Sequence, residues 1–275
     1  MAHSRILIAA NANRPFLDTS ELWRYRGVLY ALVRREIKIR YAQTIAGAAW
    51  VILQPVLTTA VLTILASHWM GGTTSGIPYP QFAYCGLVPW IYFTHVLNKA
   101  SYSMLSSGVL TKAYFPRLLL PLASSFGGLV DIAAAASILA VMMAYYRTPP
   151  ALTVLWLPVS LLLLVLTAFG IGVWLAVLNL FYRDVAHALS FVTQLWFFMT
   201  PVAYSVSLVP ESRRLLYYLN PMTGVIQCWR WALFGRAEFT PSELMVSLSS
   251  AAGILLTGLW YFRRHEPIFA DVGEG

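Results

Sequence analysis

Long apolar segments alternate with short polar ones along most of the chain. Residues 41–98 contain no Asp, Glu, Lys or Arg, whereas four cations and one acid crowd into residues 34–40. A helix that crosses a membrane needs about 20 mostly apolar residues. The pattern therefore predicts an all-α polytopic membrane protein with six transmembrane helices. The predicted spans are residues 46–70, 81–104, 118–145, 152–180, 186–204 and 244–262.

The segment before the first span has an amphipathic pattern. At about 100° per residue, Arg34, Arg35 and Lys38 share one sector of a helix over residues 29–41. The opposite sector holds Leu29, Tyr30, Val33 and Ile37. We expect an N-terminal amphipathic helix in the membrane interface. It serves either as an anchor alone or as an anchor that also contacts a cytoplasmic partner.

Polar residues of this helix suit contact with lipid headgroups. The candidates are Arg34, Arg35, Lys38, Arg40 and Tyr41. Each cation near an anionic surface contributes roughly 1 kcal/mol, so the cluster would attract a lipid pyrophosphate, and ordinary anionic lipids equally. Glu36 and Arg40 stand in the acid-first i, i+4 order that favours an ion pair.

Residues 205–242 are too long for a simple loop and too broken for a span. Asn220 and Pro221 are typical of an N-cap followed by proline at the first helical position. We expect short re-entrant helices on the outer side, which either gate a passage or only pack as a surface hairpin. The gate candidates are Tyr217, Tyr218, Trp229 and Trp231.

Composition and charge agree with a membrane protein. The chain is 59% hydrophobic and 11% charged, with a mean hydropathy of +0.66, against roughly 25% charged residues in a soluble domain. The net charge of +8 does not favour nucleic acid, because the cations flank apolar spans. With the N-terminus inside, thirteen Lys and Arg residues are cytoplasmic and five are outside.

This charge distribution predicts that both termini are cytoplasmic. We expect the chain to lie in the cytoplasmic (inner) membrane. The predicted organisation is an N-terminal tail and interface helix over residues 1–45, a transmembrane domain over residues 46–262, and a cytoplasmic tail over residues 263–275.

Candidate chemistry is sparse. Cys85 and Cys228 have no metal-ligand spacing, so we expect no metal and interpret both as small apolar residues, with a disulfide as the alternative. No Gly-Lys pair exists for a phosphate-binding loop. The mid-span carboxylate Asp131 is expected to make structural hydrogen bonds, and proton coupling is the alternative. These features predict a chain that is not an enzyme and that depends on a separate ATPase for any ATP-driven work.

Several motifs, in their order and spacing, resemble one family. The motifs are REIKIRYAQTIAGAAWVILQP, LTKAYFPRLLLP, NLFYRDVAHAL, FMTPVAYSVSLVP, LNPMTGVIQCWRWALFG and HEPIFAD. Over roughly residues 22–271, the chain resembles the membrane subunit of ABC exporters for lipid-linked polysaccharides, the O-antigen and teichoic-acid type of permease. The resemblance implies a homodimeric channel with two cytoplasmic ATPase subunits, which would hold the ATP and magnesium. This chain would then need no cofactor of its own.

The resemblance also assigns roles to two inner loops. ATPase coupling would fall to Tyr114, Phe115, Pro116, Arg117, Tyr182, Arg183 and Asp184. An aromatic or arginine anchor in a partner's groove would transmit motion. The alternative is that Arg117 and Arg183 only mark the cytoplasmic side.

A passage for sugar rings would need apolar ring faces and hydrogen-bonding edges. The channel candidates are Trp50, Gln54, Gln194, Trp196, Phe197, Phe198 and Tyr204. The resemblance implies export of a lipid-linked polysaccharide, and the alternative is a permease of the same architecture that exports a drug or small lipid. A membrane glycosyltransferase is disfavoured because no Asp-x-Asp pair occurs. A secondary transporter is disfavoured because no inverted repeat is evident.

Overall fold

The computed structural model describes residues 19–41, 49–67, 73–74, 76–105, 115–182 and 184–266. The first half of this part of the chain comprises α1 (Thr19–Arg24), α2 (Arg26–Tyr41), α3 (Ala49–Ser67), α4 (Tyr79–Ser103), α5 (Leu119–Gly127) and α6 (Leu129–Tyr145). The second half comprises α7 (Leu157–Phe181), α8 (Asp184–Phe198), α9 (Glu211–Tyr217), α10 (Pro221–Phe234) and α11 (Pro241–His265). Two 3-10 helices are η1 (Leu152–Trp156) and η2 (Val206–Leu208). Strands β1 (Thr73–Thr74) and β2 (Ile77–Pro78) form a small antiparallel hairpin.

Four apolar stretches in the described part are long enough to cross a membrane: Ala49–Ala66, Leu119–Tyr145, Leu152–Phe181 and Pro241–His265. Each contains a run of 18 residues with high mean hydropathy and at most two charged residues, which favours burial of that run in lipid or protein. The predictions of spans starting near residues 46, 118, 152 and 244 agree with these stretches. The helices that correspond to the second and fifth predicted spans, α4 and α8, are not among them.

The third predicted span is divided between α5 and α6. The break falls at Gly128, which approaches the ring of Tyr92 on α4 so closely that a Cβ there would lie 2.9 Å from the ring carbon Cε2. Tyr92 also donates a hydrogen bond from its hydroxyl to the Ser125 carbonyl, 2.9 Å away. The tight packing of α4 against this turn explains why a glycine stands at the break.

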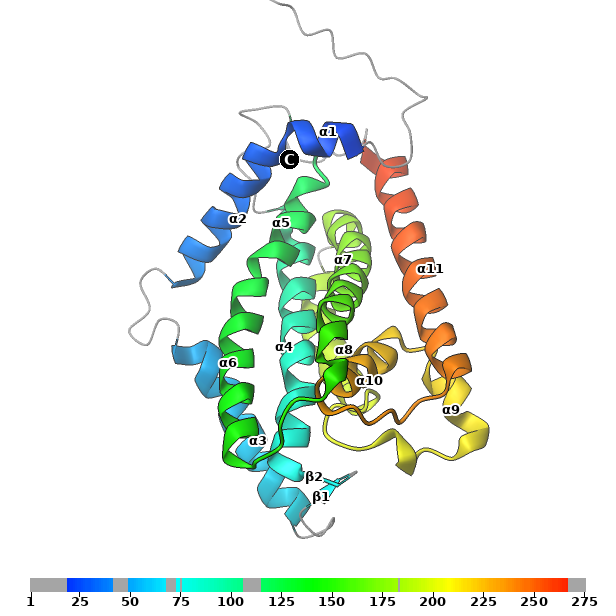
Figure 1. The fold of residues 1–275 in the computed structure, drawn as a ribbon. Helices are drawn as coiled ribbons and strands as arrows, with labels where there is room; N and C mark the ends of the chain where they lie inside the picture. The colour runs from blue at the N-terminus through cyan, green and yellow to red at the C-terminus, as the bar shows by residue number, and fades with distance from the viewer. Residues whose placement is uncertain are drawn as a thin grey trace, which may run out of the picture.

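Helix α4 lies at the centre of the bundle and packs against α3, α5, α6, α7, α8 and α10 (Figure 1). Its aromatic side chains Tyr84 and Phe93 are completely buried. Such a helix is covered by protein on most of its surface, so it can carry polar residues such as Gln81 and Asn98 that a lipid-facing helix cannot. This position explains why α4 is less hydrophobic than the four apolar stretches.

The bundle has two distinct ends. At one end, Leu32 of α2, Phe115, the last turn of α7 and Phe262 of α11 share a single apolar cluster. At the other end lie the β1–β2 hairpin, α9 and the start of α11 (Figure 1). We call them the α2 end and the hairpin end. Because α4 and α7 both end at the α2 end, the two loops that follow them lie there together with the interface helix.

Several expectations change in detail. The helix predicted over residues 29–41 is present as α2, but Tyr30, placed on its apolar side, is exposed. The fifth predicted span, residues 186–204, consists of a 15-residue helix followed by an irregular turn, because Pro201 ends the helical hydrogen bonding. The two short helices expected in residues 205–242 are present as α9 and α10. Cys85 and Cys228 are buried free thiols.

Candidate functional site

A polar cluster joins α2 to the transmembrane bundle. Arg40, in the last turn of α2, forms an ion pair with Asp131 of α6. It also approaches Nδ1 of His95 on α4 through Nη2, at 2.9 Å. Because an arginine can only donate, Nδ1 of His95 must accept, which places the histidine proton on Nε2. The expected pair between Glu36 and Arg40 is therefore wrong, and the arginine instead links three helices.

This finding bears on Asp131. The side chains of Arg40 and Asp131 are only 18% and 14% exposed. A carboxylate in that setting requires a partner, and the partner comes from the interface helix, outside its own span. Through this ion pair, Asp131 fixes the C-terminal end of α2 to α6 of the bundle.

The other expected headgroup residues lie differently. Arg34, Arg35 and Lys38 are exposed on α2. The side chain of Tyr41 lies outside the described residues. Leu29, Leu32 and Val33 pack into the apolar cluster at the α2 end. Helix α2 therefore exposes these three cations, while Arg40 and the apolar residues contact the bundle.

The first inner loop is partly buried. Tyr114 lies outside the described residues, Phe115 and Pro116 are buried, and Arg117 is half-buried before α5. The ring of Phe115 packs into the apolar cluster at the α2 end. Phe115 and Pro116 thus anchor the loop, and a contact surface for a partner would have to be supplied by its neighbours.

The second inner loop is more open. Tyr182 is 64% exposed and Asp184 is also exposed, whereas Arg183 lies outside the described residues. The carboxylate of Asp184 stands in the first turn of α8, where it complements the helix dipole. Of the described coupling candidates, Tyr182 is the one with the largest accessible aromatic surface.

Asn179 positions this second loop, and the sequence reasoning missed it. Its Nδ2 donates to the Ser101 carbonyl at the end of α4, 2.9 Å away, and its Oδ1 accepts from the Ala186 amide at 3.2 Å. One buried amide therefore connects α4, α7 and α8. The available signal was a single polar residue in an otherwise apolar run, within the motif NLFYRD.

The channel candidates separate into two groups. Trp50, Gln54, Gln194 and Phe198 are exposed on α3 and α8. Trp196 and Phe197 instead pack edge-on against Phe93 and Trp90 of α4. The indole of Trp196 also donates to Asn220 Oδ1 at 3.0 Å. The exposed group can face a passage, whereas the inner group contributes to packing between α8 and the bundle.

Asn220 connects this packing to the hairpin end. Its Oδ1 accepts from the Met222 amide at 3.1 Å, as an N-cap does, while its Nδ2 donates to Thr200 Oγ1 at 2.9 Å. The predicted N-cap is confirmed. The same side chain therefore caps α10 and holds the C-terminal turn of α8.

A buried arginine clamps the turn after α8. Arg230 of α10 is 3% exposed. Its guanidinium donates to the carbonyls of Pro201 and Val202, at 2.7 and 2.5 Å, and lies 3.6 Å from the ring centroid of Phe82 on α4. Gly86 leaves the required space, because a Cβ there would come within 2.4 Å of the Val202 carbonyl.

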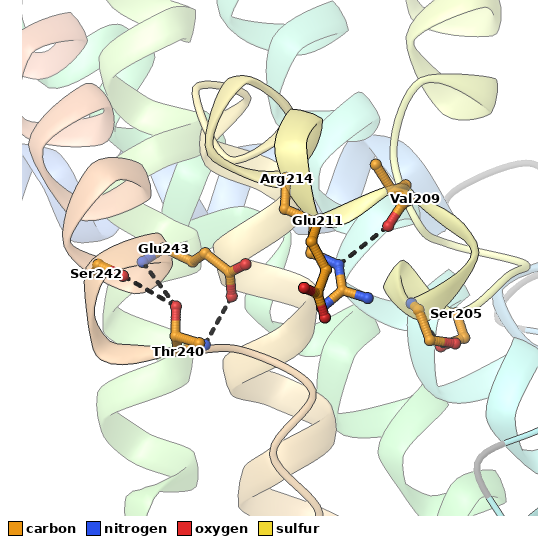
Figure 2. Close-up of polar contacts among 8 residues, drawn as sticks. Ser205, Val209, Glu211, Arg214, Thr240, Ser242 and Glu243 are labelled. Atoms are coloured by element: carbon orange, nitrogen blue, oxygen red, sulfur yellow. Dashed lines mark hydrogen bonds and ion pairs between the residues drawn. The ribbon is translucent and has the colours of Figure 1, made fainter.

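The remaining part of the hairpin end is organised by caps (Figure 2). Thr240 and Glu243 form a capping box that starts α11. Arg214 of α9 donates from Nε to the Val209 carbonyl at 3.1 Å, which closes the turn before α9. These contacts make the segment between α8 and α11 a packed unit.

The expected gate residues occupy different environments. Tyr218 and Trp229 are buried in the protein, whereas Tyr217 and Trp231 are half-buried. The hydroxyls of Tyr217 and Tyr204 bond to each other, and burial together with this bond raises the pKa of Tyr217. Gating by these side chains stays a prediction.

Comparison with known proteins identifies the family to which the chain is similar. The profile of the ABC-2 type transporter family matches residues 27–234. The chain is 32% identical to the O-antigen export system permease protein RfbA of Myxococcus xanthus, over 90% of this chain and 96% of that protein. Two proteins of the same name from Klebsiella pneumoniae are 26% and 25% identical, over 89% of this chain and 94% of each of them.

Proposed function

Because the chain belongs to the ABC-2 type transporter membrane family, we propose that it is the permease subunit of an ATP-driven exporter of a lipid-linked polysaccharide. The single observation that carries the substrate class is the 32% identity to an O-antigen export permease across nearly the whole of both chains. This similarity favours a polysaccharide over a drug or a small lipid. The permease itself hydrolyses no ATP, and a separate cytoplasmic ATPase would bind the nucleotide and magnesium.

Chain connectivity supports six crossings. If the four apolar stretches each cross the membrane, the chain must return between α3 and α5, and again between α7 and α11. Among the described helices, α4 and α8 join the two ends at those points (Figure 1). At 1.5 Å per residue, the 25 residues of α4 extend about 37 Å and the 15 residues of α8 about 22 Å. The turn clamped by Arg230 would complete the second crossing.

Energy would enter at the α2 end. The interface helix, the first loop near Phe115, the second loop near Tyr182 and the end of α11 all meet there. Movement of the ATPase against an exposed loop is transmitted to the transmembrane helices best when that loop is connected rigidly to several of them. Asn179 provides such a connection between Tyr182 and the helices α4, α7 and α8. We therefore place the ATPase at this end, on the cytoplasmic side of the inner membrane.

The conduit would lie along α3 and α8 and include a second copy of the chain. Helix α3 exposes Trp50, Leu57 and Ile64 along its length, which suits contact with lipid or with another protomer. Gln54 and Gln194 are exposed on α3 and α8 respectively, so they could exchange hydrogen bonds with sugar hydroxyls. Many weak contacts of this kind permit sliding, whereas one tight site would stall transport.

Export can be tested by deleting and restoring the chain in its host. Loss of the permease should remove the polysaccharide from the cell surface and leave lipid-linked glycan inside, and expression of the wild-type chain should restore the surface polymer. Copurification of the tagged chain should bring down an ATPase. An unchanged surface polysaccharide in the deletion strain would contradict the proposal.

A further inference from the structure

A cavity of about 390 Å³ lies between α2, α4 and α5 at the α2 end of the bundle. Its polar side is formed by Arg35 and Glu36 of α2 and by Lys99 and Tyr102 of α4. Its apolar side is formed by Leu32 and Ile39 of α2 and by Leu120 of α5. The volume falls in the range of small-molecule sites, roughly 300–1,000 Å³.

The charged side chains that line the cavity do not form ion pairs with one another. Within the described residues, no ion pair joins Arg35 or Lys99 to an acid, whereas the neighbouring Arg40 is paired with Asp131. Two cations and one carboxylate leave the cavity with a formal charge of +1. A ligand with one negative charge would neutralise it.

The cavity also selects for an amphiphile. Cations from two different helices converge on it, and Glu36 and the hydroxyl of Tyr102 lie beside them. A phosphate diester would occupy the cations, and the hydroxyl groups of its polar substituent would donate to the Glu36 carboxylate. The side chains of Leu32, Ile39 and Leu120 would then contact the start of an acyl chain.

We propose that this cavity binds the headgroup of an anionic phospholipid that carries a single phosphate and a hydroxylated substituent. The bound lipid bridges Arg35 on α2 to Lys99 on α4 and so holds the interface helix against the bundle. The inference rests on the location of α2 at the membrane surface and not on the transported substrate. Lipid binding therefore succeeds or fails independently of export.

The test uses the full chain in mild detergent and native mass spectrometry with three probes. These are phosphatidylglycerol, phosphatidylethanolamine and inorganic phosphate. We expect one retained phosphatidylglycerol per chain, weaker retention of phosphatidylethanolamine and no competition by millimolar phosphate. Equal retention of both lipids, or displacement by free phosphate, would overturn the proposal.

Variants locate the site. Arg35→Gln and Lys99→Gln should each weaken phosphatidylglycerol binding about fivefold, the effect of removing one cation near an anionic group. Glu36→Gln should not weaken binding of the phosphate but should reduce the preference for phosphatidylglycerol. Arg213→Gln is the matched control, because this exposed cation lies on α9 at the hairpin end, away from the cavity, and should change affinity less than twofold. Arg34→Gln, on α2 but outside the cavity lining, should weaken binding less than Arg35→Gln does.

Equal weakening by Arg34→Gln and Arg35→Gln would contradict a defined site and indicate general attraction to a basic helix. Arg35 is exposed, so its substitution should leave the fold intact even if Lys99→Gln does not accumulate. Unaltered lipid retention in Arg35→Gln would be sufficient to reject the assignment.

Discussion

The Arg40–Asp131 pair gives the sharpest quantitative prediction. The two side chains are 18% and 14% exposed, so each is largely removed from water, and the pair joins α2 to α6. Breaking a buried pair by removing one partner costs about 3–5 kcal/mol, because the other charge stays buried without compensation. We expect Asp131→Asn to destabilise the chain by about 3 kcal/mol, at the low end of that range because some solvent reaches the pair.

A double-mutant cycle separates the pair from its surroundings. The double variant Arg40→Met/Asp131→Leu should lose less unfolding free energy than Arg40→Met alone or Asp131→Leu alone, because no charge is then left unpaired. The interaction energy of the cycle should exceed about 1 kcal/mol, within the range for directly contacting residues. His95 will retain some contact with Arg40 in the Asp131→Asn variant, so His95→Ala is needed to measure its share.

The assay is equilibrium unfolding of the purified chain in mixed micelles, followed by circular dichroism. Arg34→Gln is the matched control, since an exposed cation on the same helix should change stability by less than about 0.5 kcal/mol. A cost below about 1 kcal/mol for Asp131→Asn, or an interaction energy near zero, would refute the conclusion that this pair fixes α2 to the bundle.

Three further predictions concern other contacts. Gly86→Ala should lower the thermal stability of the chain, because its Cβ would meet the Val202 carbonyl at 2.4 Å, and wild-type stability in a melting experiment would disprove the tight approach. Asn179→Ala should cost about 1–3 kcal/mol by leaving buried polar groups without partners; stability equal to wild type in the same mixed-micelle assay would show that the bridge is unimportant. Tyr182→Ala should uncouple ATPase activity from glycan export while the chain still inserts. Tyr145→Ala, an exposed aromatic at the hairpin end, is its control, and equal export by the two variants would argue against coupling at Tyr182.

The sequence predicted elements wherever local chemistry determines them. The charge-free run after Tyr41 predicted α3, the amphipathic pattern predicted α2, and the Asn220-Pro221 pair predicted the start of α10 with its cap. Each of these signals lies within a few residues of the structure it specifies. Hydrophobic periodicity and capping are local effects, so one sequence is sufficient to detect them.

The polar contacts between distant segments escaped prediction. Asp131 had no partner in its own helix, and nothing in the sequence indicates that Arg40 would reach it. Arg230 interrupted an apolar helix pattern, but its role as a clamp depends on carbonyls exposed by a turn after α8. Such contacts depend on the tertiary packing of helices, which local patterns do not encode.

Cysteine accessibility tests most directly whether the α2 end faces the ATPase side of the membrane. Tyr182→Cys and Tyr145→Cys replace exposed side chains, 64% and 79% accessible, at opposite ends of the bundle, while native Cys85 and Cys228 are buried. In spheroplasts treated with a membrane-impermeant maleimide, position 145 should react at once and position 182 only after permeabilisation. Reaction of position 182 in intact spheroplasts, with protection of position 145, would put the coupling loops outside the cell and contradict the proposed mechanism.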